Sequence, residues 1–122
     1  MYQVDVEGNL HSAAPLPIDR LRGLTAVGFD PIDKLVYYAE GYPGIIKRSF
    51  LNGTSDETIV NGVYWANRLA IDFINRNIYF TDSSRNRIDV ATLDGMHRTS
   101  LITTPWPEGI ALDLKNGLVL FF

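Results

Sequence analysis

Cysteine is absent from all 122 residues, so the chain holds neither a disulfide framework nor a thiolate metal site. Basic runs are absent as well. The chain has 11 basic and 14 acidic residues, and the basic ones do not form the stripe that nucleic-acid binding requires. The first residues contain no basic segment followed by an apolar one, so they encode no signal peptide. Even the longest runs of aliphatic and aromatic residues, such as 118–122, are far shorter than the roughly 20 residues of a membrane helix. The segment itself is therefore expected neither to target nor to span a membrane, and its compartment stays open.

What is present is an internal repeat, in a composition that is 46% hydrophobic and 11% aromatic and thus typical of a globular chain. The first marker of the repeat is an aspartate that recurs at positions 30, 72 and 113, each seven positions before Tyr37, Tyr79 or Leu120. The second is a turn that ends in glycine, at positions 8, 53 and 95. Two independent markers thus give one period of 41 to 45 residues. Short strands and turns that repeat at this period predict the blades of a β-propeller.

The repeat predicts an all-β fold, a partial β-propeller of four-stranded antiparallel blades. β-branched and aromatic residues fill the predicted strands, and Asn, Asp and Gly fill the turns. The predicted strands are 1–8, 10–16, 24–30, 35–40, 45–51, 56–60, 68–73, 77–82, 86–92, 97–103, 108–113 and 118–122. We expect 1–23 to end one blade, 24–65 and 66–107 to form two blades, and 108–122 to begin a further, truncated one. Almost no helix is expected, because no window has a helical apolar period.

Several repeated residues are best explained by blade geometry. Small residues at 28, 70 and 111 suit a crowded inner strand, and aromatic residues on the next strand can fill the gap between blades. The residues assigned to this structural repeat are Asp30, Tyr37, Glu40, Asp72, Tyr79, Phe80, Thr81, Asp82 and Asp113. The repeated aspartates could also form a ring of carboxylates for a metal ion or for acid–base chemistry. The favoured interpretation, for Glu40 and Asp82 too, is that each carboxylate caps backbone N–H groups of its own turn.

No set of residues indicates catalysis. The two histidines, His11 and His97, are not spaced with any repeated carboxylate or serine, and solvated positions are favoured over a pH-sensing role. No nucleophile with a base and no phosphate-binding loop can be assembled. We therefore predict no catalytic, cofactor-binding or metal-binding residues.

The connections that leave the second and fourth strands would emerge on one face and carry the side chains typical of protein-binding hot spots. The candidate protein-binding residues are Tyr42, Tyr64, Trp65, Arg85, Trp106 and Glu108. Trp65 and Trp106 occupy equivalent positions in successive repeats, and for these two, packing between the blades is the favoured alternative.

Asn52-Gly53-Thr54 is an acceptor sequence for N-linked glycosylation on a predicted turn. An ordinary Asn-Gly hairpin turn explains the same residues. The sequence leaves both interpretations open, and the first requires secretion.

Three linked segments resemble one known family. Asn77-Ile78-Tyr79-Phe80-Thr81-Asp82 resembles the Tyr-Trp-Thr-Asp repeat of the low-density-lipoprotein receptor family, and the stretch 106–113 resembles what precedes that repeat. The segments 87–90 and 93–98 resemble its third strand and turn. The resemblance covers nearly the whole chain. It departs at Tyr38, Phe80 and Phe121, which replace the tryptophan of the repeat. It also departs at Ala39, which replaces the threonine, so the hydrogen bond that the threonine makes in its blade must be replaced or lost there.

The resemblance implies a six-bladed propeller flanked by cysteine-rich modules, in the ectodomain of a single-span endocytic or signalling receptor or in a matrix protein. It implies protein ligands, no enzymatic activity, no cofactor, and no membrane or nucleic-acid contact by this segment. The pattern of the third strands is most similar to the receptor-related branch, which includes co-receptors for Wnt signals. By this resemblance the chain is expected to be a fragment that begins near the start of such a propeller.

Two alternatives stay open. Propeller hydrolases of the lactonase or esterase type contain a similar Pro-Glu-Gly-Ile-Ala stretch and, as a class, bind a calcium ion on the propeller axis. Two copies of this chain could also complete one ring head to tail, although a fragment explains the ends more simply.

Overall fold

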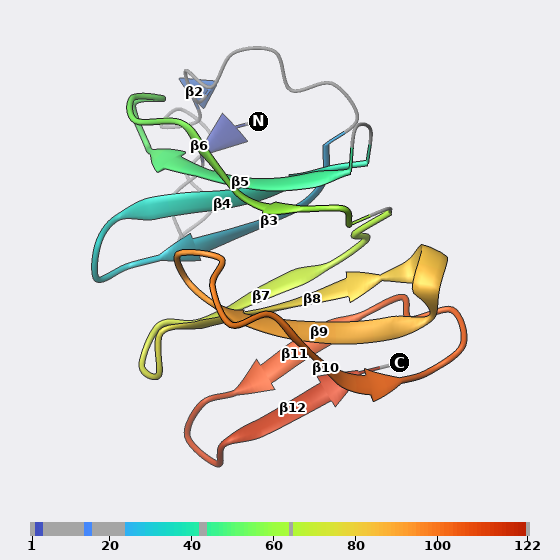
Figure 1. Ribbon diagram of the computed structural model, residues 1–122. Helices are drawn as coiled ribbons and strands as arrows, with labels where there is room; N and C mark the ends of the chain where they lie inside the picture. Colours follow the sequence, from blue (N-terminus) through green and yellow to red (C-terminus); the bar gives the residue numbers. More distant parts are fainter. Residues whose placement is uncertain (1, 4–13, 16–23, 42–43, 64, 122) are drawn as a thin grey trace.

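The computed structural model describes residues 2–3, 14–15, 24–41, 44–63 and 65–121. Its backbone is built from antiparallel strands (Figure 1). β1 (Tyr2–Gln3) pairs with β2 (Ala14–Pro15) in a two-stranded sheet. The one helical element among the described residues is the short 3-10 turn η2 (Ser83–Arg85). The all-β prediction is confirmed.

Two four-stranded sheets follow, each with its strands in chain order. The first contains β3 (Leu24–Asp30), β4 (Leu35–Glu40), β5 (Ile45–Phe50) and β6 (Glu57–Asn61). The second contains β7 (Leu69–Asp72), β8 (Asn77–Asp82), β9 (Arg87–Thr92) and β10 (Thr99–Thr103). A further hairpin contains β11 (Ile110–Asp113) and β12 (Leu118–Phe121).

The registers of the two large sheets repeat the sequence period. Tyr79 pairs with Ala70 on one side and with Val90 on the other. Tyr37 occupies the same place in the first sheet, between Gly28 and Arg48. The spacing found in the sequence therefore corresponds to equivalent positions in successive sheets.

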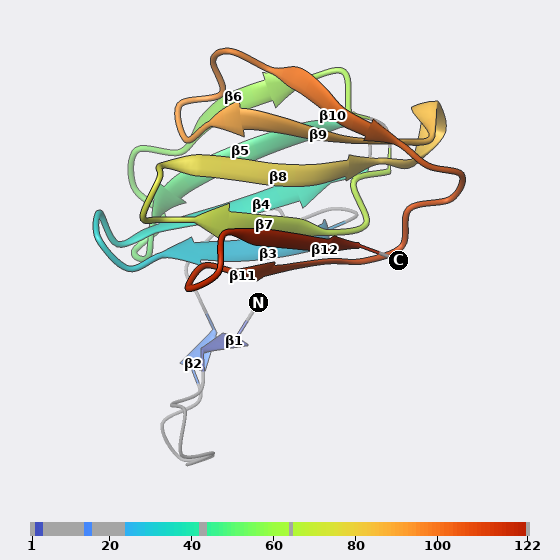
Figure 2. The same cartoon turned by 90° about the horizontal axis from the view of Figure 1, so that it is seen from below.

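Successive sheets pack face to face, in the order in which they occur along the chain (Figure 1). Figure 2 shows the first strands β3, β7 and β11 together at one edge and the last strands β6 and β10 at the opposite edge. β7 contacts both β3 and β11, which confirms that the inner strands adjoin one another. Sheets whose first strands gather in this way are blades of a propeller, and the chain forms part of one.

The core lies between the first two sheets. Its largest side chains include Tyr37, Ile46, Ile78 and Phe80, all fully buried. A Cβ added to Gly28 would lie 2.5 Å from Leu69 Cδ1, so the inner strand of the first sheet packs closely against side chains of the second, and Leu69 would have to shift to admit a side chain there.

The connections form two opposite faces. We use the term loop face for residues 62–63, 65–68, 83–86 and 104–109, and turn face for residues 31–34, 51–56, 73–76, 93–98 and 114–117. In Figure 1 the loop face is on the right and the turn face is on the left.

Candidate protein-binding face

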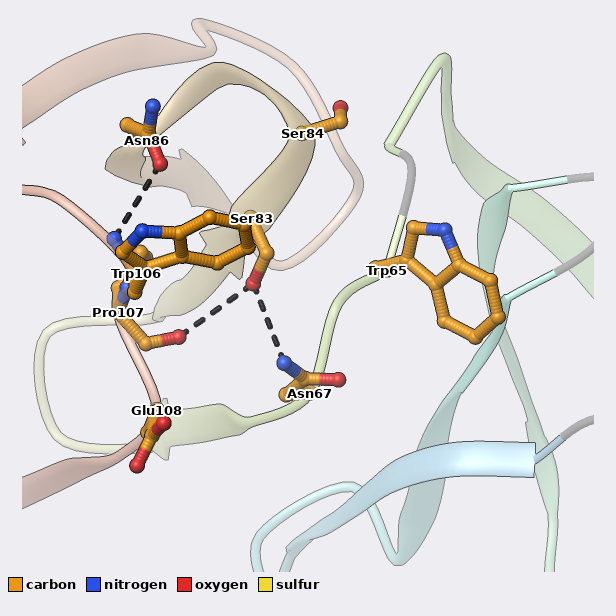
Figure 3. A pocket seen from close by; sticks show the side chains of 8 residues that line it. All are labelled: Trp65, Asn67, Ser83, Ser84, Asn86, Trp106, Pro107 and Glu108. Carbon is orange, nitrogen blue, oxygen red and sulfur yellow. Dashed lines mark hydrogen bonds between the residues drawn. The ribbon is translucent and has the colours of Figure 1, made fainter.

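A cavity of about 430 Å³ opens on the loop face between the two tryptophans (Figure 3). Trp65 and Trp106 stand on opposite sides of it, and polar groups lie between them. The lining residues are Trp65, Asn67, Ser83, Ser84, Asn86, Trp106, Pro107 and Glu108.

Both tryptophans adopt a left-handed backbone conformation, with φ of 61° at Trp65 and 50° at Trp106. The backbone N–H of Trp106 is held by the side-chain oxygen of Asn86, 3.2 Å away. The two residues are 60% and 76% exposed, respectively. Neither ring is buried between the sheets that the structure describes, so the favoured prediction that the two rings pack between blades does not hold there.

The polar side of the cavity is built by hydrogen bonds between loops. Asn67 Nδ2 donates to Ser83 Oγ at 3.2 Å, and Ser83 Oγ donates to the backbone oxygen of Pro107 at 3.4 Å. These bonds join the connections that precede β7, β9 and β11. Exposed Glu108 supplies a carboxylate at the rim. Aromatic walls with a polar floor and one charge suit the recognition of a peptide segment of a protein.

Arg85 lies on the loop face outside the lining of the cavity. Its Nη1 donates to the backbone oxygen of Gly62 at 2.7 Å and to Asp82 Oδ2 at 2.9 Å. The side chain therefore links the second sheet to the first, and its role in protein binding stays a prediction. Tyr42 and Tyr64, the other aromatic candidates, lie outside the described residues.

An ionic cluster lies along β8, β9 and β10. Asp82 and Asp89 are buried, and Arg98 bonds to both, with Nη2 3.1 Å from Asp82 Oδ2 and Nε 2.8 Å from Asp89 Oδ2. The guanidinium of Arg98 also lies 5.2 Å from the centroid of the Phe80 ring. Arg87 Nε approaches Asp89 Oδ1 at 3.0 Å.

This cluster corrects one expectation. Asp82 makes no side-chain hydrogen bond to the backbone at the start of η2. Its carboxylate instead accepts bonds from Ser84, Arg85 and Arg98. Bonds from charged guanidinium groups are stronger than those from backbone N–H groups, so they determine where the carboxylate points.

The equivalent positions of the first sheet hold the opposite charges. Lys47 stands one repeat before Asp89, and Asp56 stands one repeat before Arg98. Lys47 binds Asp56 at 2.7 Å. Tyr38, which corresponds to Phe80, donates its hydroxyl to Asp56. Burial and the bond to Asp56 both raise the pKa of Tyr38, so the phenol remains a donor at neutral pH.

The three repeated aspartates lie at the turn face, away from the cavity. Their Oδ1 atoms accept bonds from turn N–H groups: Asp30 from Ile32 at 3.0 Å, Asp72 from Asn75 at 3.0 Å and Asp113 from Asn116 at 3.3 Å. Among the described residues, no three His, Cys, Asp or Glu side chains gather as a metal site would require. The geometry is that of turn caps.

Asp30 has an additional partner from the next sheet. Arg76 donates Nη1 to Asp30 Oδ1 at 3.0 Å and Nη2 to Oδ2 at 2.8 Å. Burial alone would raise the pKa of Asp30, but the bonds and charge of Arg76, together with backbone N–H bonds from its own turn, outweigh burial, and the pKa lies below its usual value. The paired carboxylate raises the pKa of Arg76 in turn.

The remaining motif positions are structural in their contacts. Thr81 Oγ1 accepts a bond from the backbone N–H of Arg68 at 3.2 Å. Ala39 cannot make this bond, and in its place Thr25 Oγ1 donates to the backbone oxygen of Ala39 at 3.3 Å. Glu40 ends β4, paired in the ladder with residues of β3 and β5.

Two further candidates lie on the turn face. Asn52 is exposed on the turn between β5 and β6. His97 is exposed on the turn between β9 and β10, with φ of 55°. His11 lies outside the described residues.

Sequence reasoning missed the polar part of the cavity. Asn67 and Ser83 were expected in connections without a role of their own, and Asn86 was expected to begin a strand, although only the recurrence of Asn at turn positions could have drawn attention to it. It also missed Arg76 and Arg98, because their partners lie in strands that only the tertiary fold brings near.

No described segment forms a helix with the length and apolar character that crossing a bilayer would require. A family model described as low-density lipoprotein receptor repeat class B matches residues 76–114. The low-density lipoprotein receptor-related protein 5 of Mus musculus is 33% identical over 102 residues, which is 80% of this chain and 6% of that protein.

A chain in the crystal structure of a nidogen/laminin complex superimposes with a TM-score of 0.84 at 29% identity, covering 93% of this chain and 44% of the other. The chain thus spans less than half the length of either of these relatives. The matched family is a receptor-type repeat, and the shared fold extends over nearly all of this sequence. The chain belongs to the low-density lipoprotein receptor class B, or YWTD, repeat family of β-propellers.

Proposed function

We propose that the loop face binds a protein ligand and that the chain acts as part of an extracellular receptor propeller. The observation that carries the proposal is the pair of exposed tryptophans beside a cavity of about 430 Å³. Large aromatic side chains left in solvent at the rim of a cavity are unfavourable for the free protein and are typical of binding hot spots.

The relatives support the same class of function. One is a receptor-related protein, and the other is found in a complex of two proteins. Receptor signalling of the Wnt co-receptor type and endocytosis are the cellular roles that this proposal covers. Each requires a protein ligand at the ectodomain, and the loop face is the site that we propose for it.

The two tryptophans allow a direct test, because they are the only ones in the chain. A ligand that covers the loop face shifts the intrinsic tryptophan fluorescence. The probes are purified laminin, a secreted Wnt protein, and peptides selected on the wild-type chain from a random displayed library. Affinities are then measured for Trp65→Ala and Trp106→Ala.

We expect each tryptophan substitution to weaken the selected binder by about 30-fold, as loss of a hot spot worth about 2 kcal/mol would. The matched controls are Ile74→Ala and Met96→Ala, which remove exposed apolar side chains from the turn face. Their affinities should change less than about threefold. Binders that tolerate both tryptophan substitutions and lose affinity with the controls would place recognition on the turn face and contradict the proposal.

A further inference from the structure

The turn between β5 and β6 contains more polar side-chain groups than are needed to hold its conformation. Thr54 N–H donates to Asn52 Oδ1 at 3.0 Å, and Gly53 N–H donates to the backbone oxygen of Phe50 at 2.9 Å. The Asn52 side-chain oxygen thus closes an Asx turn, a common way to stabilise such a reversal. The fold uses this oxygen and the positive φ of Gly53, 80°.

The equivalent turn of the second sheet shows that an asparagine is not required. Asp94 and Met96 stand one repeat after Asn52 and Thr54. Met96 N–H donates to Asp94 Oδ1 at 3.0 Å, the same bond at the same distance. An aspartate therefore closes this turn equally well, and a methionine serves at the third position.

Two groups of the first turn are left over after this comparison: the Asn52 Nδ2 amide and the Thr54 hydroxyl. Thr54 Oγ1 donates to Asn52 Oδ1 at 2.6 Å, so the hydroxyl lies against the carboxamide. Nδ2 donates no hydrogen bond to any residue that the structure describes. Both residues are exposed, on a turn that reaches past the ends of its strands.

An exposed asparagine with a hydroxyl residue two positions later is what N-linked glycosylation requires, and this is the one such acceptor sequence in the chain. We propose that Asn52 carries an N-linked glycan. The inference rests on the extracellular placement in the proposed function, because the transferase acts in the secretory pathway.

The transfer uses a lipid-pyrophosphate-linked oligosaccharide as donor. The bond between Asn52 Nδ2 and the anomeric carbon forms as the bond from that carbon to the pyrophosphate oxygen breaks. The lipid pyrophosphate leaves with the electron pair of that bond, and one Nδ2 proton passes to a base of the transferase. The Oδ1 acceptor that closes the turn is not consumed, so the folded turn can keep its conformation after modification.

The position of Asn52 also determines where the glycan stands. The turn belongs to the turn face, at the opposite ends of the strands from Trp65 and Trp106 (Figure 1). A glycan at Asn52 therefore extends away from the candidate binding cavity. It adds bulk and solubility on one face and leaves the other open to a ligand.

The test is translation of the chain, with an appended signal sequence, in the presence of microsomal membranes. Only the protease-protected, translocated product is scored. We expect a mass increase that peptide N-glycosidase removes, leaving heavy oxygen at position 52 when the digestion is run in heavy-oxygen water. Asn52→Gln and Thr54→Val should abolish the increase, and Thr54→Ser should retain it.

The matched control transplants the acceptor sequence to the second sheet. Asp94→Asn with Met96→Thr should add a second glycan, because the two turns share their geometry. Translocated wild-type chain without a glycan at Asn52 would overturn the proposal, whether or not the transplanted site is modified. The signal sequence imposes translocation, so this result is independent of the ligand-binding test of the loop face. Wild-type chain should also bind the loop-face probe equally before and after glycan removal.

Discussion

At the scale of single residues, the two large sheets differ in one ion pair, whose acidic and basic residues occupy exchanged positions. In the second, Asp89 and Arg98 form a pair whose carboxylate is fully buried. In the first, Lys47 and Asp56 form the reversed pair, whose carboxylate is 37% exposed. The aromatic neighbour matches each case: Tyr38 donates to the carboxylate of Asp56, whereas the apolar ring in the second sheet faces the guanidinium.

This difference in burial predicts unequal energies for the two pairs. Arg98→Ala leaves the carboxylates of Asp89 and Asp82 buried with fewer partners, and we expect a loss of about 3 kcal/mol of unfolding free energy. Asp56→Ala removes an exposed pair and one hydroxyl bond, and we expect a loss of about 1 kcal/mol. Urea unfolding measures both. Equal losses would show that the second pair is as well hydrated as the first.

A second prediction at this scale concerns pH. The folded pKa of Asp30 is lowered by Arg76, so the pair stabilises the fold above the unfolded pKa of about 3.9 and loses this effect as pH falls through the lowered folded value. Arg76→Gln should cost about 1–2 kcal/mol at pH 7, less than a fully buried pair because Arg76 is partly exposed. The cost should shrink below about pH 4.

The matched control for this measurement is Lys34→Gln. Lys34 occupies the corresponding turn of the first sheet, with φ of 57° against 62° at Arg76. It should change the unfolding free energy by less than about 0.5 kcal/mol at either pH. A cost for Arg76→Gln that does not depend on pH would mean that packing, and not the ion pair, accounts for it.

At the scale of elements, turns of one sheet fit against strands of another. The turn between β9 and β10 approaches β6, and a Cβ added at Gly95 would lie 1.9 Å from the backbone oxygen of Ile59. Gly95 also has φ of 84°. The glycine is therefore needed for conformation and for space together, and the turn fixes the distance between the two sheets at their outer strands.

Gly95→Ala should consequently cost at least about 3 kcal/mol, because the backbone of β6 must move as well. Gly117→Ala is the matched control: its φ is 65°, but no atom lies within 4 Å of an added Cβ. Its cost should be only about 1 kcal/mol. Thermal and urea unfolding compare the two, and similar costs would indicate that β6 yields easily.

At the scale of the whole molecule, apolar side chains remain uncovered at both ends of the stack. Val27 and Phe29 alternate along one face of β3, and Leu118 and Leu120 along one face of β12, each about half exposed. Exposed apolar sheet faces are typical sites of association between molecules, and we expect this chain to associate through them.

Sedimentation velocity should therefore show a sedimentation coefficient that rises with protein concentration. Leu118→Lys together with Leu120→Lys should suppress the rise, because charges on the face oppose contact. Ile74→Lys, which changes an exposed apolar residue on the turn face, should leave the rise unchanged. A constant monomer value for the wild-type chain at every concentration would refute this expectation.

Periodicity was sufficient to predict the strands from residue 24 onward, because each of these sheets repeats local alternation and turn chemistry at a fixed interval; of the predicted strands 1–8 and 10–16, the described residues show only β1 and β2. It could not predict contacts between sheets, such as Arg76 with Asp30, since these depend on distances set by the stack. It also misplaced Trp65, because a left-handed backbone at a tryptophan has no signal in composition. The repeat therefore determines blade geometry, and the connecting loops determine the candidate site.

The reversed charge pairs affect which strands can pair with one another when the chain folds. If β9 paired with β6 in the equivalent register, Asp89 would meet Asp56. If β5 paired with β10, Lys47 would meet Arg98. Both exchanges bring like charges together. The opposite order of the charges in the two sheets therefore disfavours pairing between strands of different sheets during folding.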